Sequence, residues 1–148
     1  MNPDGSDVRV IPLDAGHNMS PAWSPDGRRI AFVSIRTWQG EGKVDNWDIY
    51  VVNVDGTELR RLTTYHDVDR HPTWSPDGTQ IAFERLLLTP RGQFDIFVMN
   101  ADGTNERNIT NDPSDDLYPS WCPVPLATAV SPEGKTPLLW AQLKRAGH

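Results

Sequence analysis

The chain has 148 residues and a formal net charge of -6, with 23% charged and 37% hydrophobic residues. Nucleic-acid surfaces need clustered lysine and arginine, so this acidic balance argues against a nucleic-acid partner. The sequence has no apolar run as long as a bilayer span and opens with no basic-then-apolar leader, which argues against membrane insertion.

The first recognisable element is Asn2–Pro12, an Asp-Gly turn followed by a short segment with strand character. The same pattern returns at Asn53–Thr63 and at Asn100–Thr110, so the chain consists of internal repeats. We predict that each copy carries a hairpin turn and the polar outer strand of a sheet. The first copy supplies an extra outer strand over residues 7–12.

The pentapeptide Trp-Ser-Pro-Asp-Gly follows, at Trp23–Gly27 and again at Trp74–Gly78. Proline suits the second position of a turn, and glycine accepts the left-handed conformation that the turn requires. We expect each tryptophan to pack between neighbouring sheets. The aspartates of the Pro-Asp-Gly and Asp-Gly turns are expected to bond their own backbone; they are Asp26, Asp77, Asp55 and Asp102.

Two further strands complete each repeat. The segments "RRIAFVS" and "TQIAFER" are typical of strands buried on both faces, and "DIYVVN" and "DIFVMN" are rich in β-branched and aromatic residues. Four antiparallel strands in a unit of 47 to 51 residues predict an all-β fold made of β-propeller blades. The complete blades span 21–63 and 72–110.

The two blades differ in length at one place, the connection around residues 35–47. Length variation confined to one segment marks a loop, and loops on a rigid scaffold carry recognition. Trp38 and Trp47 lie in this segment. We therefore predict that it contacts a protein partner.

The residue pattern resembles the TolB-type propeller repeat: Pro-x-Trp-Ser-Pro-Asp-Gly-x-x-Ile-Ala-Phe at Pro21–Phe32 and Pro72–Phe83, then Asp-Ile-Tyr/Phe-Val and Asp-Gly-Thr. The resemblance implies a six-bladed propeller that binds the lipoprotein Pal and other proteins of an envelope complex. It also implies a periplasmic or otherwise extracytoplasmic location, whereas the missing leader leaves a cytoplasmic location open.

The number of blades does not close a ring, because propellers typically contain four to eight. After the second blade the sequence offers only an extra inner strand over 118–122. In one interpretation the chain is part of a longer propeller, and residues 124–148 are a tail with a short helix. In the other, 124–148 form a degenerate third blade, and two copies complete a six-bladed ring as a homo-oligomer.

Candidate site residues lie in the loops that lead from each outer strand to the next inner strand. Carboxylates gathered there near the propeller axis would suit calcium, although their spacing is not that of an EF-hand. These residues are Asp67, Asp69, His71, Asp112, Asp115 and Asp116.

The sequence shows no Gly-x-Ser-x-Gly elbow and no nucleophile–His–carboxylate spacing, so we expect no enzymatic activity. The expected function is a propeller scaffold for protein–protein binding. The alternatives are an accessory propeller of a serine peptidase without its catalytic domain, or a propeller with calcium at the channel mouth.

Overall fold

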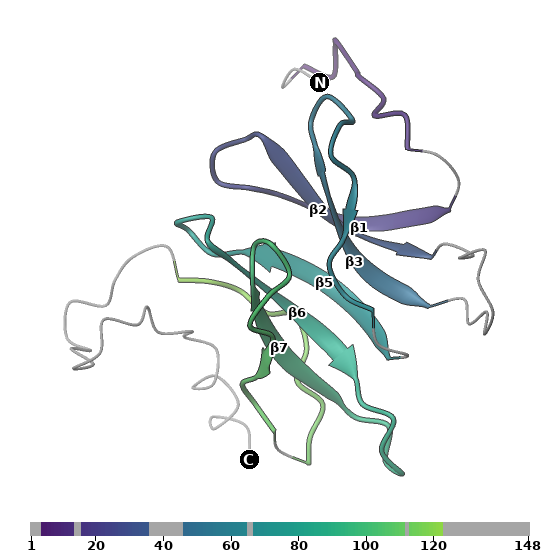
Figure 1. Cartoon of the computed structure of the whole chain (residues 1–148), viewed down its shortest axis with the longest axis vertical. Helices are drawn as coiled ribbons and strands as arrows, with labels where there is room; N and C mark the ends of the chain where they lie inside the picture. Colours follow the sequence, from purple (N-terminus) through teal and green to yellow (C-terminus); the bar gives the residue numbers. More distant parts are fainter. Residues whose placement is uncertain (1–3, 14–15, 36–45, 65–66, 112, 123–148) are drawn as a thin grey trace.

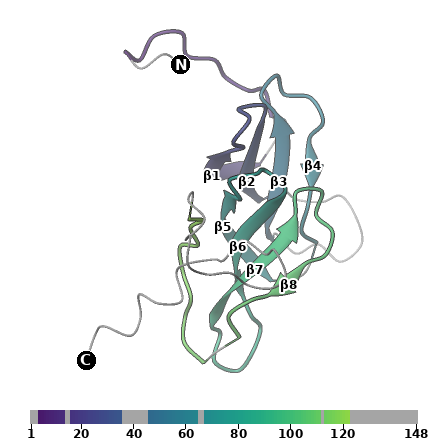
Figure 2. The ribbon, with the colours of Figure 1, turned by 90° about the vertical axis from the view of Figure 1, so that its left-hand side faces the viewer.

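The computed structural model describes residues 4–13, 16–35, 46–64, 67–111 and 113–122. All regular elements in these ranges are strands, and they form two four-stranded antiparallel sheets (Figure 1). Figure 2 shows the strands of each sheet in chain order, from β1 to β4 and from β5 to β8. The predicted all-β architecture of propeller blades is confirmed.

Both sheets follow the same plan, with three seven-residue strands and a two-residue outer strand. The first contains β1 (His17–Trp23), β2 (Arg29–Ile35), β3 (Trp47–Asn53) and β4 (Arg60–Arg61). The second contains β5 (Val68–Trp74), β6 (Gln80–Leu86), β7 (Phe94–Asn100) and β8 (Arg107–Asn108).

The turn chemistry read from the sequence is present. Gly27 and Gly78 have φ values of 67° and 69°, which glycine adopts without a steric cost. The Asp26 carboxylate accepts hydrogen bonds from Ser24 Oγ at 2.6 Å and from the Arg28 amide at 3.0 Å. The aspartates of the other three turns, Asp55, Asp77 and Asp102, likewise accept a backbone amide two residues ahead. The prediction that these aspartates bond their own backbone is confirmed.

The inner strands start earlier than the predicted boundaries of 21 and 72, because each crosses a β-bulge. The register of β1 against β2 shifts between Met19 and Ala22, and β5 against β6 shifts in the same way. Ser20 and His71 occupy the left-handed region at these bulges, with φ values of 52° and 49°. An extra residue in one strand lets pairing continue on both sides of the irregularity.

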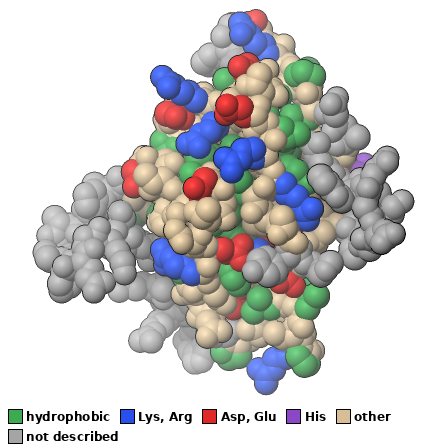
Figure 3. Space-filling view, in the orientation of Figure 1, with side chains coloured by type: hydrophobic (Ala, Val, Ile, Leu, Met, Phe, Trp, Pro, Cys, Tyr) green, Lys and Arg blue, Asp and Glu red, His purple; other side chains and the backbone are tan. Residues whose placement is uncertain are grey.

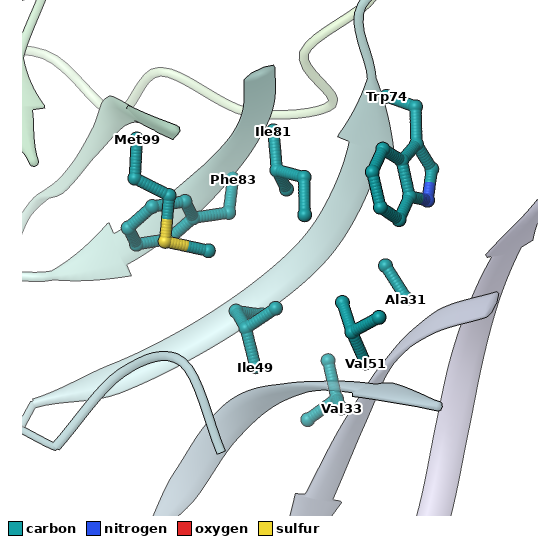
Figure 4. Packing of buried hydrophobic residues seen from close by; sticks show 8 residues of the cluster. All are labelled: Ala31, Val33, Ile49, Val51, Trp74, Ile81, Phe83 and Met99. Carbon is teal, nitrogen blue, oxygen red and sulfur yellow. The ribbon is translucent and has the colours of Figure 1, made fainter. Parts of the chain in front are cut away.

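The main core lies between the two sheets, where side chains from alternate positions of each sheet meet (Figure 4). Alternate residues of a strand point to opposite faces, so each central strand contributes to two interfaces. The side chains of this core are Ala31, Val33, Ile49 and Val51 from the first sheet and Trp74, Ile81, Phe83 and Met99 from the second. Each sheet also has apolar residues on its other face, as a blade with two neighbours requires.

The segments at both ends of the described chain sit where further blades would begin and end. Neither 7–12 nor 118–122, both within the described ranges, is hydrogen-bonded into either of the two sheets. Ile11 lies against the hairpin turn at Gly56, just as Leu62 lies against the turn at Gly103. Tyr118 repeats the left-handed bulge conformation with a φ of 57°. Residues 124–148, predicted as a degenerate blade or a tail, lie outside the described residues.

Candidate functional site

The described carboxylates of the loops before the inner strands differ in their burial. Asp69 and Asp116 are buried, whereas Asp115 is exposed and Asp67 is half-buried. The Asp115 carboxylate accepts a hydrogen bond from the Phe94 amide at 2.9 Å. Asp112 lies outside the described residues.

Asp69 belongs to a buried ion network between the two blades. Its carboxylate accepts two hydrogen bonds from Arg85, at 2.7 Å from Nε and at 3.0 Å from Nη2. Arg85 also pairs with Glu106, and its guanidinium lies over the Phe97 ring at 4.7 Å. This paired, fork-like geometry holds β5, β6 and the segment before β8 together. Both oxygens of Asp69 are therefore engaged within the protein.

Asp48 lies near this network and is almost fully buried. Its carboxylate pairs with Arg61 Nη2 at 2.7 Å, which ties β3 to the outer strand β4. Burial raises the pKa of Asp48 to about 6, although the Arg61 charge opposes part of that rise and the Asp69 charge adds to it. Burial also raises the pKa of Asp69, against the hydrogen bonds from Arg85.

His71 contacts a buried residue that the sequence reading missed, Glu84. The Glu84 side chain is fully buried, and its Oε2 lies 3.0 Å from His71 Nδ1 and 3.5 Å from Arg70 Nη2. Its other oxygen accepts the Tyr118 amide at 2.5 Å. Glu84 therefore connects the second blade to the extended segment that follows it.

A signal for Glu84 and Arg85 was present in the sequence. "TQIAFER" places two charged residues in a strand that the repeat predicts to be buried, where the first blade has Val33 and Ser34. Charged side chains are almost never fully buried unless they are paired. That break in the repeat marks the ion network.

Of the two tryptophans in the connection around residues 35–47, the structure describes only one. Trp38 lies outside the described residues. Trp47 begins β3, opposite Ile35, and packs half-buried against the main core. Its role in contacting a partner stays a prediction.

The described residues contain no group of three or more histidine, cysteine or acidic side chains arranged to hold a metal ion. On the face seen in Figure 3, basic and acidic side chains are interspersed over the two sheets. Within the described part of the chain no helix is long and apolar enough to cross a bilayer.

The repeated tryptophan makes a repeated contact across the blades. Trp74 is 6% exposed and donates its Nε1–H to the carbonyl of Ala22 on β1, at 3.1 Å. Trp121 donates in the same way to the carbonyl of Thr73 on β5, also at 3.1 Å. The prediction that tryptophan packs between neighbouring blades is confirmed at Trp74, whereas Trp23 is exposed.

Comparison with known families agrees with this geometry. Residues 4–86, more than half of the chain, match the family described as TolB beta propeller domain. The chain belongs to the TolB β-propeller family. Its two sheets are therefore two blades of a TolB propeller.

Relatives of this TolB propeller chain extend well beyond it. It is 38% identical over 79 residues to the Tol-Pal system protein TolB of Alcanivorax borkumensis, a match that covers 53% of this chain and 17% of the relative. It is 41% identical over 73 residues to an uncharacterized peptidase, YuxL, of Bacillus subtilis, covering 48% of this chain and 10% of the relative. The chain thus spans at most about a fifth of these relatives.

Solved TolB structures share the arrangement of the sheets. The structure of a putative TolB from Agrobacterium tumefaciens matches with a TM-score of 0.59 and 28% identity, over 74% of this chain and 35% of that one. TolB from Acinetobacter baumannii matches with a TM-score of 0.58 and 24% identity, over 74% of this chain and 25% of that one, which supports the fold.

Proposed function

We propose that this TolB propeller chain is a non-enzymatic scaffold that binds a protein partner of a Tol-Pal type system in an extracytoplasmic compartment. The observation that carries the proposal is the similarity to Tol-Pal system TolB over 79 residues, together with the family match over residues 4–86. The non-enzymatic part of the proposal is supported by the contacts of the two acid–base candidates. Asp69 pairs with Arg85, and His71 contacts Glu84. Their side chains serve the packing of the scaffold.

The proposed contact surface is the connection between β2 and β3, which ends at Trp47. It is the segment by which the two otherwise matching blades differ in length, and it is held between two strands paired in full register. A loop anchored in this way presents its side chains without disturbing the sheet. The second blade closes the same position with the shorter connection 87–93.

A binding titration tests the proposal. The soluble domain of a Pal lipoprotein from the same organism is titrated into the chain, and we expect saturable one-site binding. A variant whose residues 36–46 are replaced by the sequence of 87–93 should keep its circular dichroism spectrum and lose binding. The matched control, Leu88→Ser in the second blade's connection, should bind as the unmodified chain does. Absence of binding by the folded, unmodified chain would contradict the proposal.

A second candidate is an accessory propeller of a serine peptidase, which the match to the B. subtilis peptidase favours. In that case the chain would gate access to a catalytic domain encoded with it. Coexpression with such a domain, followed by hydrolysis of peptides of graded length, would show a size limit imposed by the chain. A size profile that is the same with and without the chain would exclude this role.

We further propose that assembly with another chain completes the propeller. The extra outer segment 7–12 and inner segment 118–122 lie at opposite ends of a two-blade stack, and both keep the backbone conformations of their repeat positions. Blades with apolar residues on both faces require neighbours on both sides.

A further inference from the structure

Residues 115–118, which we name the strap, are bonded at one end to the start of β7. The Asp115 carboxylate accepts a hydrogen bond from the Phe94 amide at 2.9 Å. The Asp116 amide donates to the Phe94 carbonyl at 2.7 Å. Phe94 is the first residue of β7 and directly follows the connection 87–93. The strap therefore holds both backbone groups of the residue at which this connection ends.

The other end of the strap is bonded to β6. The Tyr118 amide donates to Glu84 Oε1 at 2.5 Å, and Glu84 lies near the end of β6, just before the connection 87–93. The strap is thus fixed on both sides of this connection. The first blade has Val33 at the position of Glu84, so it has no carboxylate there for such a bond.

His71 lies against the two groups that meet at this end of the strap. Its Nδ1 is 3.0 Å from Glu84 Oε2, and its ring packs on the Tyr118 ring with centroids 4.9 Å apart. His71 and Tyr118 occupy the same position in successive repeats, and both are left-handed, with φ values of 49° and 57°. His71 Nδ1 and Glu84 Oε2 are buried, and neither has another hydrogen-bond partner among the described residues.

The contact between Nδ1 and Oε2 needs a proton on the histidine, because two lone pairs repel each other at 3.0 Å. A neutral imidazole carries its one proton on either ring nitrogen, whereas an imidazolium carries a proton on both. Protonation therefore places a donor at Nδ1 in every molecule and makes the contact charge-assisted. A cationic ring is also attracted to the face of an aromatic ring such as that of Tyr118. Histidine is the side chain that makes this change between pH 5 and 8.

Glu84 and Arg70 are the charged groups that face His71 within the described chain. Glu84 on β6 attracts the imidazolium, whereas Arg70 on β5, with Nη2 at 3.5 Å from Glu84 Oε2, opposes a second positive charge. The titratable side chain that the strap adds at this end is Tyr118, and β7 places uncharged Ile96 opposite Glu84. A buried carboxylate is costly unless its charge is compensated, so docking of the strap against Glu84 is more favourable when His71 is charged.

We propose that protonation of His71 tightens the strap, so that pH sets how firmly the strap holds the connection 87–93. The stabilisation is complete at acidic pH, where the ring is charged, and it is lost as the pH rises and the ring becomes neutral. The device belongs to the second blade, because the first has Ser20 and Val33 at the positions of His71 and Glu84. It goes beyond the proposed binding of a partner and does not depend on it.

Hydrogen exchange measured by NMR on the full chain reports on both ends of the strap. The exchange rates of the Tyr118 and Phe94 amides are divided by the intrinsic rate at each pH between 5.5 and 8, which gives their protection. We expect the protection of both amides to fall about fivefold over this range, the difference between a charge-assisted and a neutral hydrogen bond. The lower limit keeps ordinary aspartates ionised.

Two variants remove the two halves of the charge pair. His71→Asn should lose most of the slope, because asparagine has no charge and accepts the left-handed conformation. Glu84→Gln should lose it as well, while its side-chain oxygen still accepts the Tyr118 amide. His17→Asn, at an exposed histidine of β1, is the matched control and should keep the profile of the original chain. Circular dichroism at each pH checks that the variants remain folded.

Two buried carboxylates define the baseline of this experiment. Burial raises the pKa of Asp48 to about 6 and also raises the pKa of Asp69, which pairs with Arg85 on the other face of the sheet. His71→Asn keeps both aspartates, so the slope that remains in this variant belongs to them.

Three results would overturn the proposal. The first is an equal slope in the original chain and in His71→Asn, and the second is a full slope in Glu84→Gln. The third is a change at the Tyr118 amide with none at Phe94, because the histidine would then act on its neighbour alone and the strap would not respond as a unit.

Discussion

At the level of single residues, the two blades place different chemistry on the same backbone. Ser34 Oγ donates to Asn18 Oδ1 at 2.7 Å in the first blade, and the same two positions hold Arg85 and Asp69 in the second. The substitution turns a partly exposed neutral pair into a buried ion pair. Buried ions cost desolvation energy, so such a pair is stabilising only while both partners are present.

Arg85→Ser should therefore lower the free energy of unfolding by about 3–5 kcal/mol, because it leaves the Asp69 carboxylate buried beside Glu106. The triple variant Asp69→Asn, Arg85→Ser, Glu106→Leu copies the residues of the first blade and should recover most of that loss. Urea unfolding at one fixed chain concentration measures both. Equal stability of the single variant and the original would contradict a structural role for the network.

Asp48 predicts how stability depends on pH. Its pKa is raised to about 6 in the folded chain, compared with an ordinary value of 3.8, so the folded state holds this proton more tightly than the unfolded state does. Stability should rise as the pH falls from 7.5 to 5, by about 1.4 kcal/mol from this group, because about one pH unit of that range lies below the folded pKa.

Thermal melting at several pH values checks this expectation. Asp48→Asn should flatten the profile between pH 7.5 and 5. The control Asp55→Asn should not, because hydrogen bonds from Thr57 lower the pKa of that exposed turn carboxylate and place its titration at more acidic pH. A profile that keeps its slope in Asp48→Asn would contradict the assignment.

At the level of strands and turns, two equivalent glycines separate the effect of close packing between blades from the effect of the left-handed turn conformation. Gly56 and Gly103 occupy the same hairpin turn, with φ values of 86° and 87°. A Cβ at Gly103 would lie 3.1 Å from the carbonyl oxygen of Leu62, whereas at Gly56 its nearest contact is an ordinary 3.6 Å. Both alanine variants carry the same left-handed strain, but only one meets backbone.

We expect Gly56→Ala to cost about 1–2 kcal/mol for the left-handed conformation alone. Gly103→Ala should cost about 1–3 kcal/mol more, because the backbone at Leu62, directly after β4, must move away from the β7–β8 turn. Chemical unfolding compares the two variants directly. Equal losses would show that the outer strand of one blade does not press on the next.

We expect Glu84 to hold the segment 118–122 in place through its hydrogen bond with the Tyr118 amide. Glu84→Val copies Val33 and removes the acceptor of the Tyr118 amide, so this amide should exchange with solvent faster. Glu84→Gln keeps a carbonyl acceptor and should protect the amide better than valine does. Hydrogen exchange at the Tyr118 amide, measured by NMR, distinguishes the two variants. Equal exchange rates in the original chain and both variants would contradict a role for Glu84 in ordering this segment.

The positions of most strands and turns could be predicted from the sequence, because the repeated residues recur at fixed distances. Fixed distances among the Asp-Gly turns, the tryptophans and Phe32 or Phe83 place all four strands of each blade. The bulges at Ser20 and His71 were not predicted, since a single-residue insertion in one strand depends on its partner. Their effect was to extend the inner strands beyond the expected start.

The candidate site was predicted less well for a physical reason. Asp69 and Asp116 are carboxylates at or near the end of a loop, and such side chains are normally solvated. Asp69 is buried because Arg85, sixteen residues away, reaches it across β5 and β6. A pairing of that kind depends on the strand register and on which face of each strand is covered, which the local sequence does not specify.

At the level of the whole molecule, each of the two described blades has apolar residues on both faces, so their outward faces need further neighbours to cover them. The main core between them is one cluster of buried apolar side chains, and the tryptophan contact recurs from Ala22 to Trp74 and from Thr73 to Trp121. Trp23 alone among the three repeated tryptophans extends into solvent, at 61% exposure. That asymmetry is the physical basis for expecting a neighbour on this side.

A crystal structure of the 148-residue chain tests this expectation most directly. The account predicts a neighbouring chain packed beside β1, with Trp23 buried at the contact and its Nε1 donating to a backbone carbonyl of that neighbour. A single copy whose Trp23 is covered by its own chain, with no second copy beside β1, would contradict it.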